Sequence, residues 1–283
     1  MGNIRTVGVI GSGIMGSGLA EVAARAGFDV VARSRTRAGA DAVLHGIDAG
    51  LTKQVARERL TEDDKNAILG RITVTDDLHG LAGCDLVIES IIEDMDAKRD
   101  LFEHLDRIVK PEAILATNTS TLAVVELAMV TERPEKVCGI HFFNPAPMMK
   151  LVEVIRPLTA SDDTIDTAVE FATACGKDAV QVQDRAGFIV NALLFPYLNN
   201  AIRMWEQGTA SMDDIDTAMM GGCNFPMGPF ALLDLVGLDT SLAILDALYE
   251  EFRDPNYAAA PALRRMVAAG QLGRKTKRGF RTY

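Results

Sequence analysis

Short apolar runs alternate with longer amphipathic segments through the first half of the chain. One helix-length segment, Ile14–Ala26, directly follows the first run, and the charged stretch from about residue 35 to residue 70 is compatible with further helix. Strand-sized runs that alternate with helix-sized segments predict a mainly parallel sheet with right-handed crossovers and helices on both faces. The strand-length runs are Thr6–Ile10, Asp29–Ala32, Ile72–Val74, Leu86–Glu89 and Ile114–Ala116.

Helical periodicity dominates after about Asp162, where the only strand-like run is Ala179–Val182. We therefore predict an α/β domain over residues 1–184 and an all-α domain over residues 185–283, with the boundary near Asp184 and Arg185. Pro196 lies inside the first long segment of the second domain, and its missing N–H predicts a kink or a break there. The predicted helices of that domain are Ile189–Glu206, Met212–Met220, Phe230–Leu235 and Thr240–Phe252.

Composition and charge exclude several classes of protein. A chain of 283 residues with 48% hydrophobic and 24% charged residues is long enough for two domains with real cores. The formal net charge of -10 offers no broad positive field for a phosphate backbone, so we expect no nucleic-acid binding. No apolar run is long enough to cross a membrane and no signal peptide is evident, so we expect neither.

The four cysteines lie far apart and form no CxxC pair. This spacing argues against a zinc site, and we predict no metal. It also favours a reducing compartment, which suits a cytoplasmic protein.

A glycine-rich turn, Gly11-Ser12-Gly13-Ile14-Met15-Gly16, follows the first predicted strand and opens the first predicted helix. In this context Gly11 permits the tight turn, Gly13 lets the backbone approach a pyrophosphate, and Gly16 allows close packing of helix and strand. Ile14 and Met15 would place their N–H groups at the positive end of the helix dipole. The turn predicts a Rossmann-type dinucleotide-binding domain; the alternative is a turn that is glycine-rich for packing alone.

The acid that usually follows the second strand of an NAD site is missing. The strand runs instead into Arg33, Ser34 and Arg35, and no carboxylate stands between Asp29 and Asp41. A carboxylate would repel a 2′-phosphate, whereas a hydroxyl and guanidinium groups donate hydrogen bonds to one. We therefore favour NADP(H) as the cofactor. In the alternative, the arginines form a solvated loop and Ser34 serves NAD(H).

His141 stands apart from the other three histidines, which we expect at the surface. It ends an apolar run that enters a turn, and the next apolar run contains one acid, Glu153. If the two runs fold back on each other about Pro147, residues 141 and 153 stand opposite. A carboxylate on one imidazole nitrogen fixes the tautomer and leaves the other nitrogen to exchange a proton with a substrate. The alternative is a structural His–Glu pair.

Short polar side chains gather where another strand ends, from Thr117 through Asn118 and Ser120 to Thr121. They would lie at the carboxyl edge of the sheet, where ligands of open α/β sheets bind, although Ser120 or Thr121 could also cap a helix. Asn191 lies one turn into the first helix of the second domain. Its amide would bind substrate or join the two domains.

Together these residues resemble the short-chain 3-hydroxyacyl-CoA dehydrogenases, and among them the bacterial 3-hydroxybutyryl-CoA dehydrogenases, over essentially the full chain. The resemblance implies a Rossmann domain, an α-helical domain that forms a homodimer, and a thioester substrate. Its motifs are GVIGSGIMGSG at 8–18, DLVIESIIE at 85–93, NTSTL at 118–122, HFFNPAPMMKLVEVI at 141–155, GFIVNALL at 187–194, DDIDTAM at 213–219, PMGP at 226–229 and VGLDT at 236–240.

The resemblance also implies roles for matching positions. His141 would be the catalytic acid/base, Glu153 its orienting partner, and Ser120 and Asn191 groups that position the substrate. Positions that resemble residues near the nicotinamide and its ribose are Glu93, Lys98 and Asn118. A looser match makes Lys53 a contact for a CoA phosphate, with a solvated helix face as the alternative. The chain departs from the family pattern at Ser34, Thr121, Ala192 and Arg281.

The expected function is hydride transfer between a nicotinamide cofactor and C3 of a 3-hydroxyacyl-CoA, most simply 3-hydroxybutyryl-CoA and acetoacetyl-CoA. Two alternatives stay open at this point. One is a β-hydroxyacid dehydrogenase that acts on a free acid or a carrier-protein thioester. The other is a nucleotide-binding protein without catalytic activity.

Overall fold

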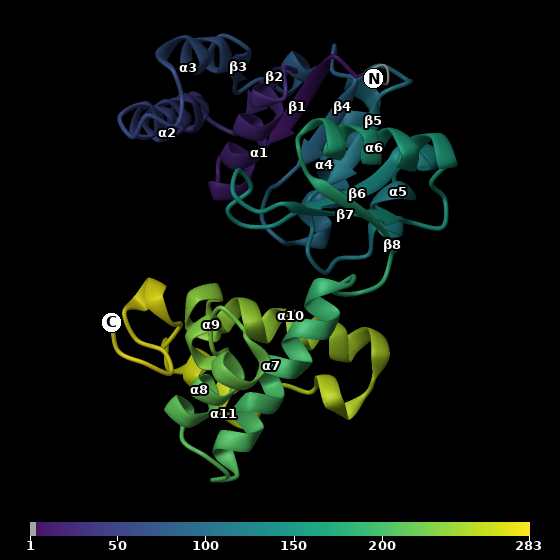
Figure 1. Cartoon of the computed structure of the whole chain (residues 1–283). Coiled ribbons are helices and arrows are strands. Elements are labelled where there is room, and N and C mark those ends of the chain that lie inside the picture. The colour runs from purple at the N-terminus through teal and green to yellow at the C-terminus, as the bar shows by residue number, and fades with distance from the viewer. Residues whose placement is uncertain (1–3) are drawn as a thin grey trace. The chain divides into compact units, whose positions relative to one another are not determined.

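An eight-stranded sheet forms the centre of the first unit of the computed structural model, which describes residues 4–283. The strands lie in the order β3-β2-β1-β4-β5-β6-β7-β8, and every neighbouring pair is parallel except β6 and β7 (Figure 1). The mainly parallel sheet expected from the sequence is therefore confirmed. The strands are β1 (Thr6–Ile10), β2 (Asp29–Arg33), β3 (Ile72–Thr75), β4 (Leu86–Glu89), β5 (Ile114–Thr117), β6 (Val137–Phe142), β7 (Leu151–Arg156) and β8 (Asp178–Gln183).

Six helices connect these strands. The charged stretch between β2 and β3 forms two of them, α2 and α3, as its composition suggested. Side chains that accept N–H groups in the first turn start four of the six: Thr36 for α2, Thr61 for α3, Asp94 for α4 and Ser161 for α6. The helices are α1 (Ile14–Arg25), α2 (Arg37–Val55), α3 (Glu62–Leu69), α4 (Met95–Ile108), α5 (Val124–Ala128) and α6 (Asp162–Ala174), with 3-10 turns η1 (Leu78–Leu81) and η2 (Pro134–Lys136).

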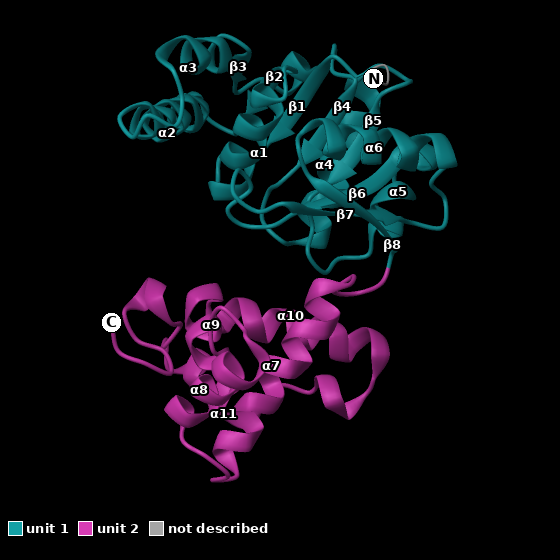
Figure 2. Ribbon diagram, viewed as in Figure 1, with its two compact units in different colours: residues 1–184 teal, residues 185–283 magenta. Residues whose placement is uncertain are grey.

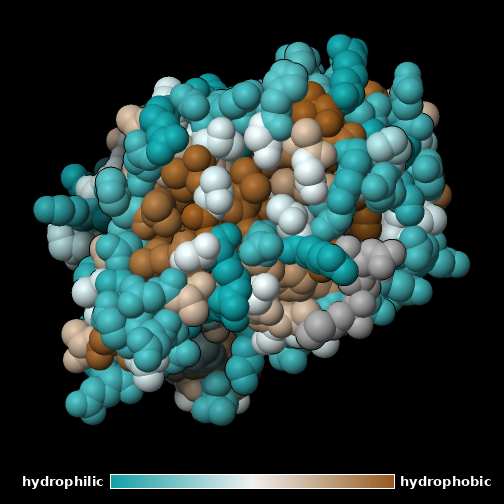
Figure 3. All heavy atoms as spheres, turned by 90° about the horizontal axis from the view of Figure 1, so that it is seen from above, coloured by the Kyte–Doolittle hydropathy of each residue, from teal (hydrophilic) through white to brown (hydrophobic). Residues whose placement is uncertain are grey.

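The central strands are buried on both faces. Every residue of β4, β5 and β6 is buried, as expected for parallel strands covered by helices on two sides. Their side chains join those of α1, α2 and α6 in one hydrophobic core. On the face drawn in Figure 3, hydrophilic residues form much of the surface around a hydrophobic patch.

The second unit, Arg185–Tyr283, is helical and has a core of its own (Figure 2). Trp205, Phe230 and Phe280 meet edge to face at its centre, with ring centroids 5.0 to 6.2 Å apart. Its elements are α7 (Val190–Glu206), α8 (Met212–Cys223), α9 (Pro229–Val236), α10 (Leu238–Phe252), α11 (Pro261–Ala268), η3 (Pro255–Tyr257) and η4 (Arg274–Thr276). The α/β unit followed by an all-α unit confirms the predicted fold class.

Of the kink or break expected at Pro196, the break is wrong, because α7 continues through that residue. A proline inside a helix removes one hydrogen bond and costs about 3 kcal/mol. Burial of Phe195, Leu198 and Ile202 in the second core offsets this cost. Helix α11 had no counterpart in the sequence prediction.

Among residues 4–283, no helix combines the length and the apolar character that a membrane crossing requires.

Candidate active site

The glycine-rich turn between β1 and α1 has a geometry that only glycine permits at two positions. Gly11 has a φ of 130°, and a Cβ there would lie 2.2 Å from the carbonyl oxygen of Ser90. A Cβ on Gly16 would lie 2.1 Å from the carbonyl oxygen of Gly11. A Cβ on Gly13 would meet nothing within 4 Å, so the backbone at this position is open to a ligand.

The start of α1 suits an anion. Gly13 is its N-cap and provides no side chain to accept the first N–H groups, and the first turn contains no acid. The free N–H groups and the positive end of the helix dipole therefore face the open space beside Gly13.

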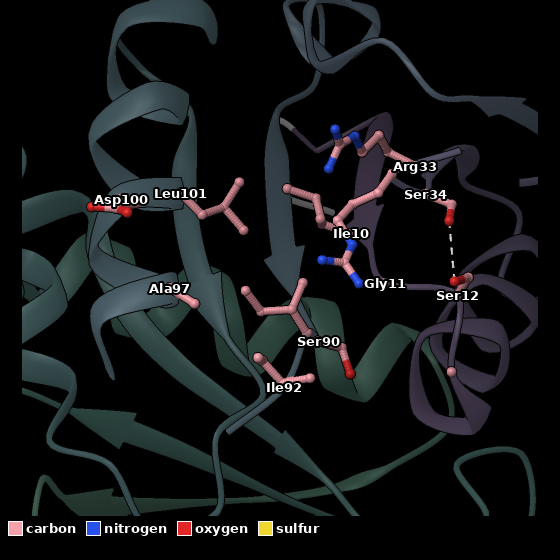
Figure 4. Close-up of a pocket in the computed structure, with 13 residues that line it drawn as sticks. Ile10, Gly11, Ser12, Arg33, Ser34, Ser90, Ile92, Ala97, Asp100 and Leu101 are labelled. Carbon is pink, nitrogen blue, oxygen red and sulfur yellow. Dashed lines mark hydrogen bonds between the residues drawn. The ribbon is translucent and has the colours of Figure 1, made fainter. Parts of the chain in front are cut away.

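A pocket lies directly against this turn (Figure 4). Residues of the turn and of the end of β2 form one side, and α4 contributes Ala97, Asp100 and Leu101 on the opposite side. Its lining residues are Ile10, Gly11, Ser12, Gly13, Arg33, Ser34, Arg35, Ser90, Ile91, Ile92, Ala97, Asp100 and Leu101.

The end of β2 brings three polar side chains to this pocket, those of Arg33, Ser34 and Arg35. Ser34 is buried, and its Oγ donates a hydrogen bond to Oγ of Ser12 at 3.1 Å. Nε of Arg33 is buried and has no hydrogen-bond partner among the described residues. Gly39 leaves room for Ser34, since a Cβ at that position would lie 2.3 Å from Ser34 Oγ. The pocket thus offers hydrogen-bond donors and positive charge at this end.

These features fit a dinucleotide. A pyrophosphate would lie at the start of α1, and the residues after β2 would hold the adenosine ribose, where the strand order places such groups in this fold. The buried Nε of Arg33 is a donor with a free hydrogen-bonding capacity at that same position.

His141 and Glu153 meet across the antiparallel pair of β6 and β7. They are register partners, and His141 Nδ1 lies 2.8 Å from Glu153 Oε2. His141 is 5% exposed and Glu153 is fully buried. The predicted register is confirmed. Because the carboxylate accepts the Nδ1 proton, Nε2 is the nitrogen that can exchange a proton with a ligand.

Neighbouring residues fix the imidazole further. The ring of Phe143 lies 4.5 Å from that of His141, centroid to centroid. Asn118 Oδ1 accepts the N–H of Phe142 at 2.8 Å, which ties the end of β5 to the strand that carries His141. Asn118 thus contacts β6 directly.

Glu93 holds the segment that contains Ser120. Its Oε1 accepts the hydroxyl of Thr119 at 2.5 Å and the backbone N–H of Ser120 at 2.9 Å. Glu93 also lies 3.3 Å from the ammonium of Lys98, which is 1% exposed. The Lys98 ammonium makes its shorter contact, 2.6 Å, with Glu89.

Cysteine chemistry plays no part in this region. Burial raises the pKa of Cys138, which lies on β6, to about 12, and the same cause raises that of Cys84 to about 12. Both are therefore neutral thiols near pH 7 rather than nucleophilic thiolates.

Two family models match the chain. Residues 6–185 match the 3-hydroxyacyl-CoA dehydrogenase NAD binding domain, and residues 187–283 match the 3-hydroxyacyl-CoA dehydrogenase C-terminal domain. The chain belongs to the 3-hydroxyacyl-CoA dehydrogenase family. The first unit is accordingly a domain for a nicotinamide cofactor.

Relatives within this family match over nearly the whole chain. A 3-hydroxybutyryl-CoA dehydrogenase of Mycobacterium tuberculosis is 47% identical over 282 residues, with 99% of each chain covered. One of Clostridioides difficile is 48% identical over 275 residues, which covers 97% of this chain and 98% of the relative. The crystal structure of (S)-3-hydroxybutyryl-CoA dehydrogenase from Ralstonia eutropha has a TM-score of 0.97 at 42% identity and covers 99% of both chains.

The other residues predicted to bind cofactor or substrate are spread over three helices of the fold. Ile14 is exposed at the first position of α1, and Met15 packs against the core. Lys53 is exposed in the last turn of α2. Asn191 belongs to the second unit, where it is buried in the first turn of α7. The roles of Lys53 and Asn191 stay predictions.

Sequence reasoning missed several residues of the nucleotide pocket. Ser12 stood inside the glycine-rich motif, but its contact with Ser34 depends on how the ends of β1 and β2 meet. Ala97 and Leu101 are four residues apart on α4 and so share a helix face, a periodicity that could have placed them together. Nothing in the local sequence marks Glu89, which ends a buried strand, as a partner for Lys98.

Proposed function

We propose that this protein transfers a hydride reversibly between a nicotinamide cofactor and C3 of a 3-hydroxyacyl-CoA, with 3-hydroxybutyryl-CoA and acetoacetyl-CoA as the reacting pair. The observation that carries the proposal is the buried His141–Glu153 pair, with 2.8 Å between Nδ1 and Oε2, in a domain that belongs to the 3-hydroxyacyl-CoA dehydrogenases. Relatives at 47% and 48% identity carry the name 3-hydroxybutyryl-CoA dehydrogenase, which supports the substrate.

The residues of the chain have distinct tasks in this proposal. When bound, the cofactor supplies or accepts the hydride at C3. Nε2 of His141 takes the proton of the 3-hydroxyl during oxidation and returns a proton to the carbonyl oxygen during reduction. Glu153 holds the Nδ1 proton and stabilises the imidazolium that forms in oxidation.

Other polar groups would position the reactants. Ser120, held through its N–H by Glu93, and Asn191 would donate hydrogen bonds to the thioester substrate. Glu93 and Asn118 would lie near the nicotinamide and its ribose. Lys98 is buried beneath Glu93, so its contribution there passes through that carboxylate. Lys53 is proposed as a contact for a CoA phosphate.

The proposal is tested by following NADPH and NADH oxidation at 340 nm with acetoacetyl-CoA. We expect turnover with the CoA thioester and at most weak turnover with free acetoacetate. Turnover with acetoacetate or a carrier-protein thioester but not with the CoA thioester would overturn the proposed substrate. The absence of turnover with all three would favour a nucleotide-binding protein without catalysis.

We further propose that the protein prefers NADP(H), with NAD(H) as the weaker cofactor. A 2′-phosphate at the end of β2 would meet the Ser34 hydroxyl and the guanidinium groups of Arg33 and Arg35, whereas the lining carboxylate, Asp100, lies across the pocket on α4. The unpaired Nε of Arg33 supports this proposal, because an anion at that position would satisfy a buried donor. A preference for NADP(H) would favour reduction of the 3-oxoacyl thioester.

The substitution Ser34→Asp tests the cofactor preference. The new carboxylate would repel the 2′-phosphate and accept ribose hydroxyls, so kcat/KM with NADPH should fall at least about tenfold relative to NADH, an energy difference of about 1.4 kcal/mol. Asn66→Asp, an equal charge change at an exposed position of α3, is the matched control. An unchanged NADPH-to-NADH ratio in Ser34→Asp would contradict the preference.

We also propose a homodimer in the cytoplasm. Large apolar side chains of the second unit are exposed, among them Leu193, Met220 and Phe225 at 72%, 46% and 42%. Covering such side chains is a common reason for subunits to associate. Light scattering after size exclusion should give a mass of two chains, and the mass of one chain would contradict the dimer.

A further inference from the structure

Glu89 is a fully buried carboxylate that neither the proton transfer nor the contacts to the nucleotide use. It ends β4 and has no exposed surface. Burying an ionised carboxylate is costly unless charges and hydrogen bonds compensate it. The environment of Glu89 provides that compensation from three different elements of the first unit.

Three donors surround the carboxylate of Glu89. Its Oε1 accepts the ammonium of Lys98 at 2.6 Å and the backbone N–H of Ile91 at 2.6 Å. Its Oε2 accepts the hydroxyl of Thr117 at 2.7 Å. The carboxylate therefore joins α4, the turn after β4 and the end of β5.

Two of these contacts lead to the pocket, those with Ile91 and Lys98. The turn held by the Ile91 N–H lines the nucleotide pocket, and the Ser90 carbonyl packs where a side chain on Gly11 would lie. Helix α4, held through Lys98, lines the pocket with Ala97 and Leu101. Glu89 and Lys98 thus connect two parts of the pocket lining, the turn at residues 90–92 and helix α4, without lining the pocket themselves.

A second carboxylate extends the connection to the segment of Ser120. The Lys98 ammonium lies 3.3 Å from Glu93 Oε2, while Oε1 of the same carboxylate accepts the Thr119 hydroxyl and the Ser120 N–H. One continuous set of contacts therefore runs from the turn at Ile91 through Glu89, Lys98 and Glu93 to Ser120.

We propose that Glu89 and Lys98 are positioning residues, whose buried ion pair holds the 90–92 turn of the nucleotide pocket and, through Glu93, the 119–121 segment in one fixed arrangement. The proposal rests on the proposed function, which assigns the 90–92 turn to cofactor binding and the 119–121 segment to substrate binding. It makes the shape of the nucleotide pocket depend on a pair that is not among the residues lining it.

The test compares the buried pair at the carboxyl end of β4 with a half-buried pair at its amino end. In Glu89→Leu/Lys98→Met both charges are replaced by apolar side chains of similar volume, a change that often leaves stability nearly unchanged. The matched control is Asp85→Leu/Lys110→Met, because Asp85 also accepts a lysine and backbone N–H groups but lies at the amino end of the strand. The dissociation constant of NADPH without substrate, the exchange of backbone amides and the Tm are measured for both.

We expect the Glu89→Leu/Lys98→Met variant to bind NADPH about 10- to 100-fold more weakly, as is typical when a supporting partner behind a ligand site is lost. Amide exchange in residues 90–93 and 119–122 should accelerate. The control should bind NADPH within about twofold of the wild type, even if its Tm falls as much or more. Wild-type affinity together with wild-type exchange in the Glu89→Leu/Lys98→Met variant would overturn the proposal, as would an equal loss of affinity in the control.

If that variant does not fold, Glu93→Ala decides the matter, since this side chain is 39% exposed. We expect faster exchange in residues 119–122, and unchanged exchange there would overturn the link to Ser120. Failure of the proposed function is distinct from both results. It would appear as a wild-type protein that does not bind NADPH or does not reduce acetoacetyl-CoA.

Discussion

The two ends of β4 hold carboxylates with similar hydrogen-bond donors, but Glu89 is fully buried and Asp85 is half-buried. Asp85, just before the strand, accepts the Lys110 ammonium and the N–H groups of Arg5 and Thr6. Glu89, the last residue of the strand, accepts the Lys98 ammonium and the N–H of Ile91. The donors are nearly the same, so the two pairs differ in burial and in location.

Location matters because the strands around β4 are parallel. Their carboxyl ends share one edge of the sheet, where the loops form the nucleotide pocket. Their amino ends share the opposite edge of the sheet. There the hydrogen bonds of Asp85 come from the Lys110 ammonium and from the backbone N–H groups of Arg5 and Thr6. We infer that the Asp85 pair contributes stability, whereas the Glu89 pair contributes to the arrangement of the site.

The largest expected effect at the carboxyl edge is that of His141→Gln. Loss of the acid/base group should lower kcat about 10²- to 10⁴-fold, the usual contribution of proton transfer. NADPH binding should survive, because the nucleotide pocket does not include residue 141. Steady-state kinetics and a fluorescence titration check the two parts, and an unchanged kcat would remove His141 from the mechanism.

Glu153→Gln should have a smaller effect of the same kind. The amide keeps the size of the side chain but no longer stabilises the imidazolium or fixes the tautomer, so kcat should fall by more than about tenfold and by less than in His141→Gln. Because Glu153 is fully buried, circular dichroism must show a native fold before kcat is compared. A wild-type kcat in folded protein would contradict the orienting role.

Patterns along the chain were sufficient to predict the sheet, the turn at Gly11 and the pairing of His141 with Glu153. Each of these depends on the spacing of apolar residues or on the symmetry of two strands about a turn, and both can be seen within a short stretch of sequence. The contacts of Glu89 with Thr117 and of Ser34 with Ser12 join residues 28 and 22 positions apart. They depend on which strands become neighbours, and this information is spread over the whole fold.

Helix α7 shows a different limit of sequence reasoning. Pro196 predicts disruption from local backbone chemistry alone, yet the helix continues because its apolar side chains are buried in the core of the second unit. Tertiary packing outweighed a local penalty there. The sequence alone, in contrast, shows that Ser34 stands where an NAD site usually has an acid, because that feature depends on the identity of one residue.

The smallest effects should arise at the amino edge. Burial disfavours the ionised form of Asp85, but the hydrogen bonds from Lys110, Thr6 and Arg5 outweigh it and hold the pKa of that carboxyl below its ordinary value. Asp85→Asn should therefore lower the free energy of unfolding at pH 7 by about 1 to 2 kcal/mol and Tm by a few degrees, with kcat and KM unchanged.

The pH dependence of this effect has a definite sign. A carboxyl whose pKa is lower in the folded state stabilises the protein above its unfolded pKa of about 3.9, and that contribution is lost as the pH falls through the folded value. Denaturant titrations should therefore show the difference between wild type and Asp85→Asn at pH 7 and a shrinking difference below about pH 4. A difference that grows with acid would contradict the assignment.

The most direct test of the division between the two edges is one initial-rate measurement at 340 nm, with NADPH and acetoacetyl-CoA at saturation, on wild type, His141→Gln and Asp85→Asn in parallel. We predict that Asp85→Asn turns over within about twofold of the wild type, while His141→Gln falls at least about 100-fold. A folded His141→Gln variant that retains the wild-type rate, or a folded Asp85→Asn variant that loses activity to the same extent, would contradict the account.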